Sequence, residues 1–182
     1  MEYMLSPPDI VRSSNQRILL DYWHTLRADR ALPVWCKVRT DKLAISHEDL
    51  SYTSVVGKDS ARRFQITFHG TRVAEAYGRM NCVGKFLDDI LPPAYSAAAL
   101  STYHQVVEGR QPVYTVSDMR DPAGRIVHYE RLLLPFGIGG PDVERILASL
   151  ETSSPEGAFE HRSLMTTSAR PPAFALCTTI QY

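Results

Sequence analysis

The pattern of apolar and polar positions begins with one clear helical period. The stripe recurs at helical spacing and consists of Ile18, Leu19, Tyr22, Trp23 and Leu26. It predicts an amphipathic helix over residues 14–29, which Ser13 opens in capping-box spacing with Gln16 and which ends before Pro33. Burying one large apolar side chain is worth about 1.5–3 kcal/mol, so the stripe must dock on something. The chain's own sheet and a second copy of the chain both remain open as the docking surface.

A strand pattern follows, after a short helix expected near Thr40–Ile45. Leu50–Gly57 and Arg62–His69 are typical of a hairpin, because β-branched and aromatic residues alternate with polar ones. In the second strand Phe64, Ile66 and Phe68 are predicted to share one face. The other face is expected to carry Arg63, Gln65, Thr67 and His69.

The stretch Gly70–Pro92 predicts two short helices, with Thr71 as a cap and with Gly78 and Gly84 as the breaks between them. A full helix over Ala94–Glu108 comes next. Three strands are then expected at Pro112–Asp121, Ile126–Phe136 and Val143–Glu151. The periodicity of the last one also fits a helix, and the glycine-rich turn before it favours a strand.

This order of elements predicts an α+β fold with a five-stranded antiparallel sheet. Helices inserted after the second strand must cover one face of the sheet, and the other face is left for the N-terminal helix. Ile126–Phe136 supports this arrangement because it is apolar on both faces. Leu132 and Leu134 are predicted on one face, with Val127 and Leu133 on the other.

The same order is that of a PAS domain, and three stretches carry a closer resemblance. LLDYWHTLRADRALP, GTRVAEAYGRMNCVGKFLDDILPP, and the pair DPAGRIVHYERLLLPF and VERILASL resemble a bacterial family of stand-alone PAS-like proteins. The resemblance covers about Leu19–Leu150. It implies a PAS fold and a signalling or regulatory role, and it implies no particular ligand.

Four segments result. They are a lead-in (1–13), an N-terminal helical segment (14–47), a PAS-like core (48–151) and a tail (152–182). Twelve of the 31 tail residues are Ser, Thr or Pro, which predicts little intrinsic order. The apolar end AFALCTTI is expected to dock on a sheet edge or on a partner.

The composition restricts the classes of partner and the cellular compartment that we expect. A formal net charge of zero argues against nucleic acid or an anionic membrane as partner, and it permits self-association. Three widely spaced cysteines suggest neither disulfides nor a zinc site. The absence of a signal-peptide pattern and of an apolar run of about 18 residues predicts a cytoplasmic protein.

Cofactor chemistry is weakly supported. Asn81-Cys82 is similar to the motif of flavin photosensors in the PAS superfamily, but three residues separate Cys82 from Phe86, and this displaces the thiol from the flavin. His104 on the long helix is the candidate haem ligand, and an isolated helical histidine more commonly has no such role. Asp88 and Asp89 point about 100° apart on a helix, which disfavours a catalytic or metal-binding pair.

The adjacent charges Glu130 and Arg131 are the sharpest polar signal, because one of them must point toward the helical layer. That residue either forms an internal salt bridge, for instance with Asp118 or Arg120, or orients a polar or carboxylate-bearing ligand. The predicted ligand-binding residues are Tyr77, Phe86, Ile90, Tyr103, Met119, Tyr129 and Arg131. No catalytic or metal-binding residues are predicted.

The leading hypothesis is a sensory or regulatory binding module that acts in trans. Its partners would be a second copy, through the N-terminal helix, or another signalling protein. Two alternatives remain: a small α+β cone-type enzyme of the isomerase or dehydratase kind, and a ligand-free interaction adaptor that uses its first helix and its tail.

Overall fold

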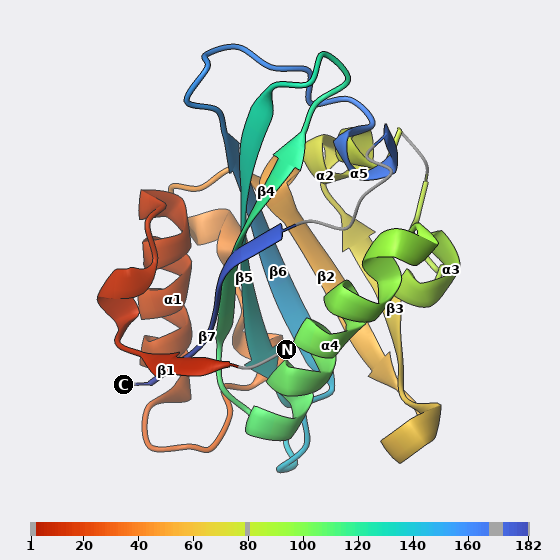
Figure 1. The fold of residues 1–182 in the computed structure, drawn as a ribbon. Coiled ribbons are helices and arrows are strands. Elements are labelled where there is room, and N and C mark those ends of the chain that lie inside the picture. Colours follow the sequence, from red (N-terminus) through yellow and green to blue (C-terminus); the bar gives the residue numbers. More distant parts are fainter. Residues whose placement is uncertain (1–2, 79–80, 168–172, 182) are drawn as a thin grey trace.

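The computed structural model describes residues 3–78, 81–167 and 173–181 (Figure 1). The strands are β1 Met4–Ser6, β2 Leu50–Val56, β3 Arg63–His69, β4 Val113–Arg120, β5 Ile126–Phe136, β6 Arg145–Ser153 and β7 Ala173–Ile180. The helices are α1 Ser14–Arg27, α2 Thr71–Ala76, α3 Leu87–Ile90, α4 Pro93–Gly109 and α5 Leu164–Thr167. Of the short helix expected near Thr40–Ile45, only a 3-10 turn over Thr40–Lys42 is present.

One mixed sheet of seven strands runs through the molecule, in the order β1-β7-β4-β5-β6-β2-β3. The five consecutive strands from β4 to β3 pair antiparallel, which is the arrangement predicted from the sequence. The prediction of a purely antiparallel five-stranded sheet is nevertheless wrong. β7 extends the sheet beyond β4, and β1 pairs with β7 in parallel.

The two added strands come from the ends of the chain. The expectation of little order in the tail does not hold for Ala173–Ile180, which forms eight residues of β7. Its apolar and β-branched residues find unpaired backbone groups along β4, and pairing there satisfies both strands. The tail end therefore docks on a sheet edge, one of the two destinations predicted for it.

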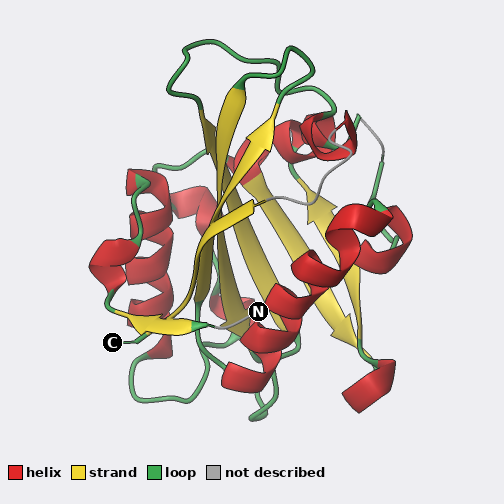
Figure 2. Ribbon diagram, in the orientation of Figure 1, coloured by secondary structure: helices red, strands yellow, loops and turns green. Residues whose placement is uncertain are grey.

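Helices cover both faces of the sheet, with α1 on one side and α2, α3 and α4 on the other (Figures 1 and 2). β5 separates two apolar cores, as its sequence predicts. Leu132 and Leu134 pack toward α1, whereas Val127 and Leu133 pack toward α4. A strand covered on both faces explains the near-continuous apolar run of β5.

Leu19 and Trp23 of the predicted stripe are buried against the chain's own sheet, whereas the inclusion of Ile18 in the stripe is wrong, because its side chain faces outward. Ser13 caps the helix by accepting a hydrogen bond from the backbone N–H of Gln16. Trp23 is fully buried, and its indole N–H donates to the carbonyl oxygen of Pro135 at 2.6 Å. Of the two docking surfaces left open by the sequence, the structure contains the sheet. A homodimer formed through this helix would have to use its outer face, where Ile18 is 39% exposed.

A bulge in β3 changes the predicted faces of this strand. Tyr52 pairs with Phe68 and Thr53 with Ile66, so Thr67 is the extra residue. An extra residue reverses the alternation beyond it. Phe68 therefore packs on Tyr52 on the α1 side, with ring centroids 4.8 Å apart, and does not share a face with Ile66 as predicted.

The turn into α2 differs from the expected Thr71 cap. Gly70 occupies the N-cap position and no side chain caps the helix. A Cβ at Gly70 would lie 2.4 Å from the carbonyl oxygens of His47 and Glu48, so glycine is required there by close backbone approach. Gly78 ends the short helix with φ +76°, as predicted.

Candidate functional site

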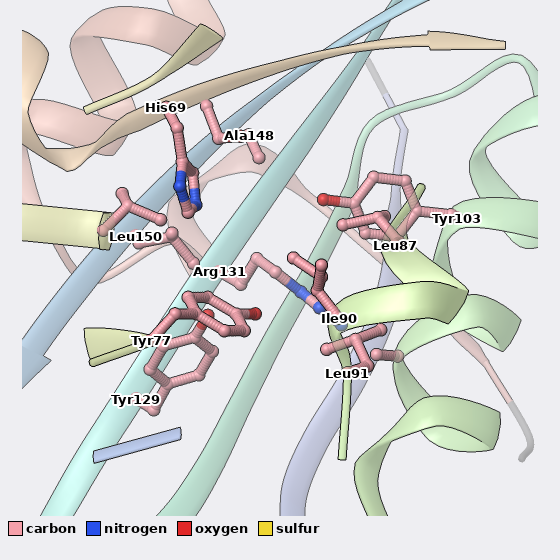
Figure 3. Close-up of a pocket in the computed structure, with 13 residues that line it drawn as sticks. His69, Tyr77, Leu87, Ile90, Leu91, Tyr103, Tyr129, Arg131, Ala148 and Leu150 are labelled. Carbon is pink, nitrogen blue, oxygen red and sulfur yellow. The ribbon is translucent and has the colours of Figure 1, made fainter. Parts of the chain in front are cut away.

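A small cavity lies between α2–α4 and the sheet, where the sequence placed it (Figure 3). Its volume is about 20 Å³, which is room for about one water molecule. Its wall is formed by Ser51, His69, Val73, Tyr77, Leu87, Ile90, Leu91, Ala99, Tyr103, Tyr129, Arg131, Ala148 and Leu150. The helical layer is thus closely packed on the sheet around this space.

A second cavity of similar volume also has Arg131 in its wall. It is also about 20 Å³, and it shares Ala99, Tyr129 and Arg131 with the first. Its remaining wall includes Met119 from β4, together with Met165 and Phe174 from the tail. Arg131 and Tyr129 therefore stand between two water-sized spaces.

Most of the residues predicted to bind a ligand gather here. Tyr77, Ile90, Tyr103, Tyr129 and Arg131 line the first cavity. Met119 lines the second cavity only.

Phe86 is the exception, because it lines neither cavity. It lies beside the β3 edge, where it pairs with Gln65, and the guanidinium of Arg63 lies 3.9 Å from its ring centroid. The segment from Cys82 to Phe86 folds along β3, and this carries the ring outside the cavity.

Of the two adjacent charges, Arg131 faces the helical layer and Glu130 faces α1. Arg131 is only 7% exposed. Its Nη2 donates to Thr102 Oγ1 at 2.6 Å, and its guanidinium lies 5.7 Å from the ring centroid of Tyr103. Glu130 accepts a hydrogen bond from the Tyr114 hydroxyl at 2.6 Å on the opposite face.

The buried guanidinium has no carboxylate partner within the described parts of the chain. The internal salt bridge with Asp118 that the sequence allowed is absent, because Asp118 lies on the face of the sheet opposite to Arg131, where it contacts His128 at 2.7 Å. The Nε of Arg131 is buried and has no acceptor. A buried charge without a counter-charge costs several kcal/mol, so this arginine is held in place at the expense of stability.

Three tyrosines surround this charge. Burial raises the pKa of Tyr77, Tyr103 and Tyr129, and the positive charge of Arg131 partly opposes that rise. Their hydroxyls therefore remain neutral at physiological pH and can donate hydrogen bonds. Figure 3 shows the hydroxyl of Tyr103 pointing into the pocket.

His69 is the polar residue of the wall that sequence reasoning missed. Strict alternation put it on the outer face of β3, and the bulge at Thr67 turns it toward the cavity. Its Nδ1 is buried without a partner, and its ring centroid lies 5.6 Å from that of Tyr77. Burial lowers the pKa of His69 to about 4. No local signal marks a bulge here, since it arises from pairing with β2.

We expect this histidine to make the fold sensitive to acid. The unfolded chain binds a proton at the ordinary histidine pKa of 6.5, whereas the folded chain resists protonation down to about 4. Stability contributed by neutral His69 is thus complete above pH 6.5 and is lost as the pH falls toward 4. We expect a loss of about 1–2 kcal/mol after allowance for partial exposure of the ring. The free energy of unfolding, measured in urea at several pH values in this range, should change less with pH in His69→Gln than in the unchanged protein. An equal dependence on pH in the two proteins would contradict the assignment.

The residues considered for cofactors lie outside the cavities. Cys82 is fully buried in the apolar core, and burial raises the pKa of its thiol. The ring of His104 packs edge-on against Phe64, with centroids 5.1 Å apart. Asp88 and Asp89 both bind Arg63, at 2.7 and 2.6 Å. The described residues contain no cluster of three metal-type ligands.

The comparisons with known proteins agree with this architecture. A family model described as "PAS domain" matches residues 11–151. The chain belongs to the PAS domain family. Membership places it among sensory and regulatory modules, and the match includes α1, the strands β2 to β5 and most of β6. The PAS match stops before α5 and β7, so the tail that lines the second cavity lies beyond it.

A search of the curated proteins found no match. In the described parts of the chain, no helix has the length and apolar character needed to cross a membrane.

Proposed function

We propose that this PAS domain is a sensory module that binds a small molecule between α2–α4 and the sheet and signals in trans. The buried guanidinium of Arg131, which meets no carboxylate in the described parts of the chain, is the observation that carries the proposal. Proteins retain such destabilising groups where a ligand uses them, and perturbed charged groups in cavities mark candidate sites.

The close packing of the cavity suggests how binding would produce a signal. A space of about 20 Å³ accepts little more than a water molecule, so a larger ligand must displace the helical layer. Arg131 on β5 is joined to Thr102 on α4 by a hydrogen bond. A ligand that competes for the guanidinium would loosen this link between helix and sheet. The resulting shift of α4 would change the surface offered to a second copy or to another protein.

Native mass spectrometry of the purified protein, with an absorbance spectrum, tests the proposal. Added mass on each chain is expected if a ligand co-purifies, and the same spectrum gives the oligomeric state. Absorbance near 400–450 nm would identify haem or flavin. A bare chain that also fails to bind any added small molecule would favour the ligand-free adaptor.

The substitution Arg131→Met should stabilise the ligand-free protein. It removes an uncompensated buried charge and replaces it with an apolar chain of similar length, and Thr102 keeps its own hydrogen bond to the Ala99 carbonyl. We expect a gain of about 1–2 kcal/mol in the free energy of unfolding, measured in urea. Arg145→Met is the matched control on β6, because Arg145 Nη1 already donates to Ser54 Oγ and its loss should destabilise. Equal destabilisation by both substitutions would contradict this interpretation of Arg131.

A further inference from the structure

We propose that the site takes a compact monocarboxylate, with its single negative charge on Arg131 and its apolar body against the helical layer. This inference rests on the proposed function, since it names the ligand class of the same site.

The charge balance of the cavities argues for one negative charge. Among the described residues, Arg131 is the only arginine or lysine in the walls of the two cavities, and none of the wall residues is an aspartate or a glutamate. At neutral pH His69 and the tyrosines at positions 77, 103 and 129 are uncharged, because burial lowers the pKa of the histidine and raises the pKa of these tyrosines. One carboxylate would neutralise the guanidinium, whereas a second would be buried without a counter-charge.

One pair of opposite charges in an adjoining cavity is already balanced. Asp49 and Arg72 line a neighbouring small cavity behind Tyr77 and Tyr129, together with His161. Arg72 Nε lies 3.4 Å from Asp49 Oδ1, so these two compensate each other. Of the described charges in these cavities, Arg131 is thus the one without an oppositely charged partner.

The donors have the geometry that a carboxylate uses. Arg131 Nε is buried and has no acceptor. Nη2 donates one of its two hydrogens to Thr102 Oγ1, and the other hydrogen is left for a ligand. A guanidinium edge with free N–H groups binds the two oxygens of a carboxylate together. A neutral amide or alcohol would leave the charge uncompensated.

The remaining wall calls for an apolar body of small size. Val73, Leu87, Ile90, Leu91 and Leu150 face the first cavity. These side chains favour a hydrocarbon tail over the bare oxygens of an inorganic anion such as nitrate. Because the cavity holds about 20 Å³, formate and acetate require the least displacement. Each further methylene buried should strengthen binding roughly threefold to fourfold until the helical layer resists.

A panel of simple salts tests the ligand class at neutral pH and constant ionic strength. Thermal unfolding would be followed with formate, acetate, propionate and butyrate at about 10 mM. Acetamide, propanol, malonate, succinate, nitrate and chloride serve as matched controls. We expect a saturable rise in the unfolding midpoint with the monocarboxylates, increasing with chain length over the first members, and no rise with the controls.

Variants assign the effect to the guanidinium. Arg131→Gln should weaken monocarboxylate binding at least about tenfold. Arg131→Lys should weaken it less, because lysine keeps the positive charge although it lacks the paired N–H donors of the guanidinium. Arg145→Gln, on the neighbouring strand, should bind as the unchanged protein does. Circular dichroism of each variant confirms that it is folded, and calorimetric titration repeats the measurement independently of stability.

The outcomes separate the ligand class from the proposed function. Equal shifts with amides or dicarboxylates, undiminished binding by Arg131→Gln, or no monocarboxylate binding at all would overturn the inference. If native mass spectrometry then shows a neutral molecule bound to the chain, the sensory function stands and only the ligand class fails. If neither a co-purified molecule nor any member of the panel binds, both fail.

Discussion

Removal of residues 154–182 is expected to leave a chain that no longer folds stably, although the family match ends at residue 151. The deleted segment supplies Leu164 and Ile180, which are completely buried, and Met165, which is 4% exposed. Burying each such side chain is worth about 1.5–3 kcal/mol. The combined loss is of the same order as the roughly 5–15 kcal/mol that stabilises a typical domain.

The deletion also uncovers backbone groups. β7 pairs with β4 from Val113 to Asp118, and its removal exposes that edge to pairing with other chains. The segment before it is tied to α2, where Ser163 N–H donates to the Glu75 carbonyl at 2.9 Å. Circular dichroism and urea unfolding of the 1–153 chain measure the effect, and aggregation is the expected form of failure.

Two point variants in β7 test whether lost side-chain burial, and not the shortening of the chain, lowers the stability. Ile180→Ala in the buried end of β7 should cost about 2–4 kcal/mol, whereas Ala173→Ser at its exposed start should stay within about 0.5 kcal/mol. A 1–153 chain with an unchanged unfolding midpoint would show that β7 is dispensable for the fold. In that case the tail would be available for partner contacts, as the adaptor hypothesis requires.

Trp23→Ala is expected to cost about 3–5 kcal/mol of unfolding free energy. Trp23 is the largest fully buried side chain of α1, and the substitution removes both its apolar surface and its hydrogen bond to Pro135. Trp23→Phe keeps a ring in place and removes the N–H, so it should cost about 1–3 kcal/mol. Urea unfolding at several protein concentrations gives both values.

The concentration dependence distinguishes the two docking surfaces for α1. If the stripe packs on the chain's own sheet, the loss in Trp23→Ala is independent of protein concentration. A loss that grows on dilution would show instead that the stripe stabilises a dimer. Ile18→Asp is the matched control on the outer face of the same helix, and it should leave stability within about 0.5 kcal/mol. If Ile18→Asp alone abolishes a dimer, the dimer uses the outer face.

Much of the architecture follows from local patterns. The stripe of α1, the β-branched and aromatic residues of β2 and the turn residues around β5 are short-range signals, and they located these elements. The alternation along Ile126–Phe136 also placed Leu132 and Leu133 on opposite faces. Local sequence sets these features because backbone geometry fixes which side chains share a face.

The errors come from long-range pairing. The bulge at Thr67 depends on the register between β2 and β3, and it moved Phe68 away from the predicted face and His69 into the cavity wall. β7 lacks a strong local signal and becomes a strand because β4 offers an unpaired edge. Phe86 missed the cavity because its segment folds along the edge of β3.

Local sequence and tertiary packing together decide how the adjacent charges Glu130 and Arg131 are placed. The sequence by itself determined that either Glu130 or Arg131 must face the helical layer, because consecutive strand residues point to opposite sides. Only the tertiary structure decided that it is Arg131 and that no carboxylate of the described residues meets it there. The physical reason is that a side chain's partners are set by which strands and helices pack against it, and residues 102 and 131 meet only in the folded chain.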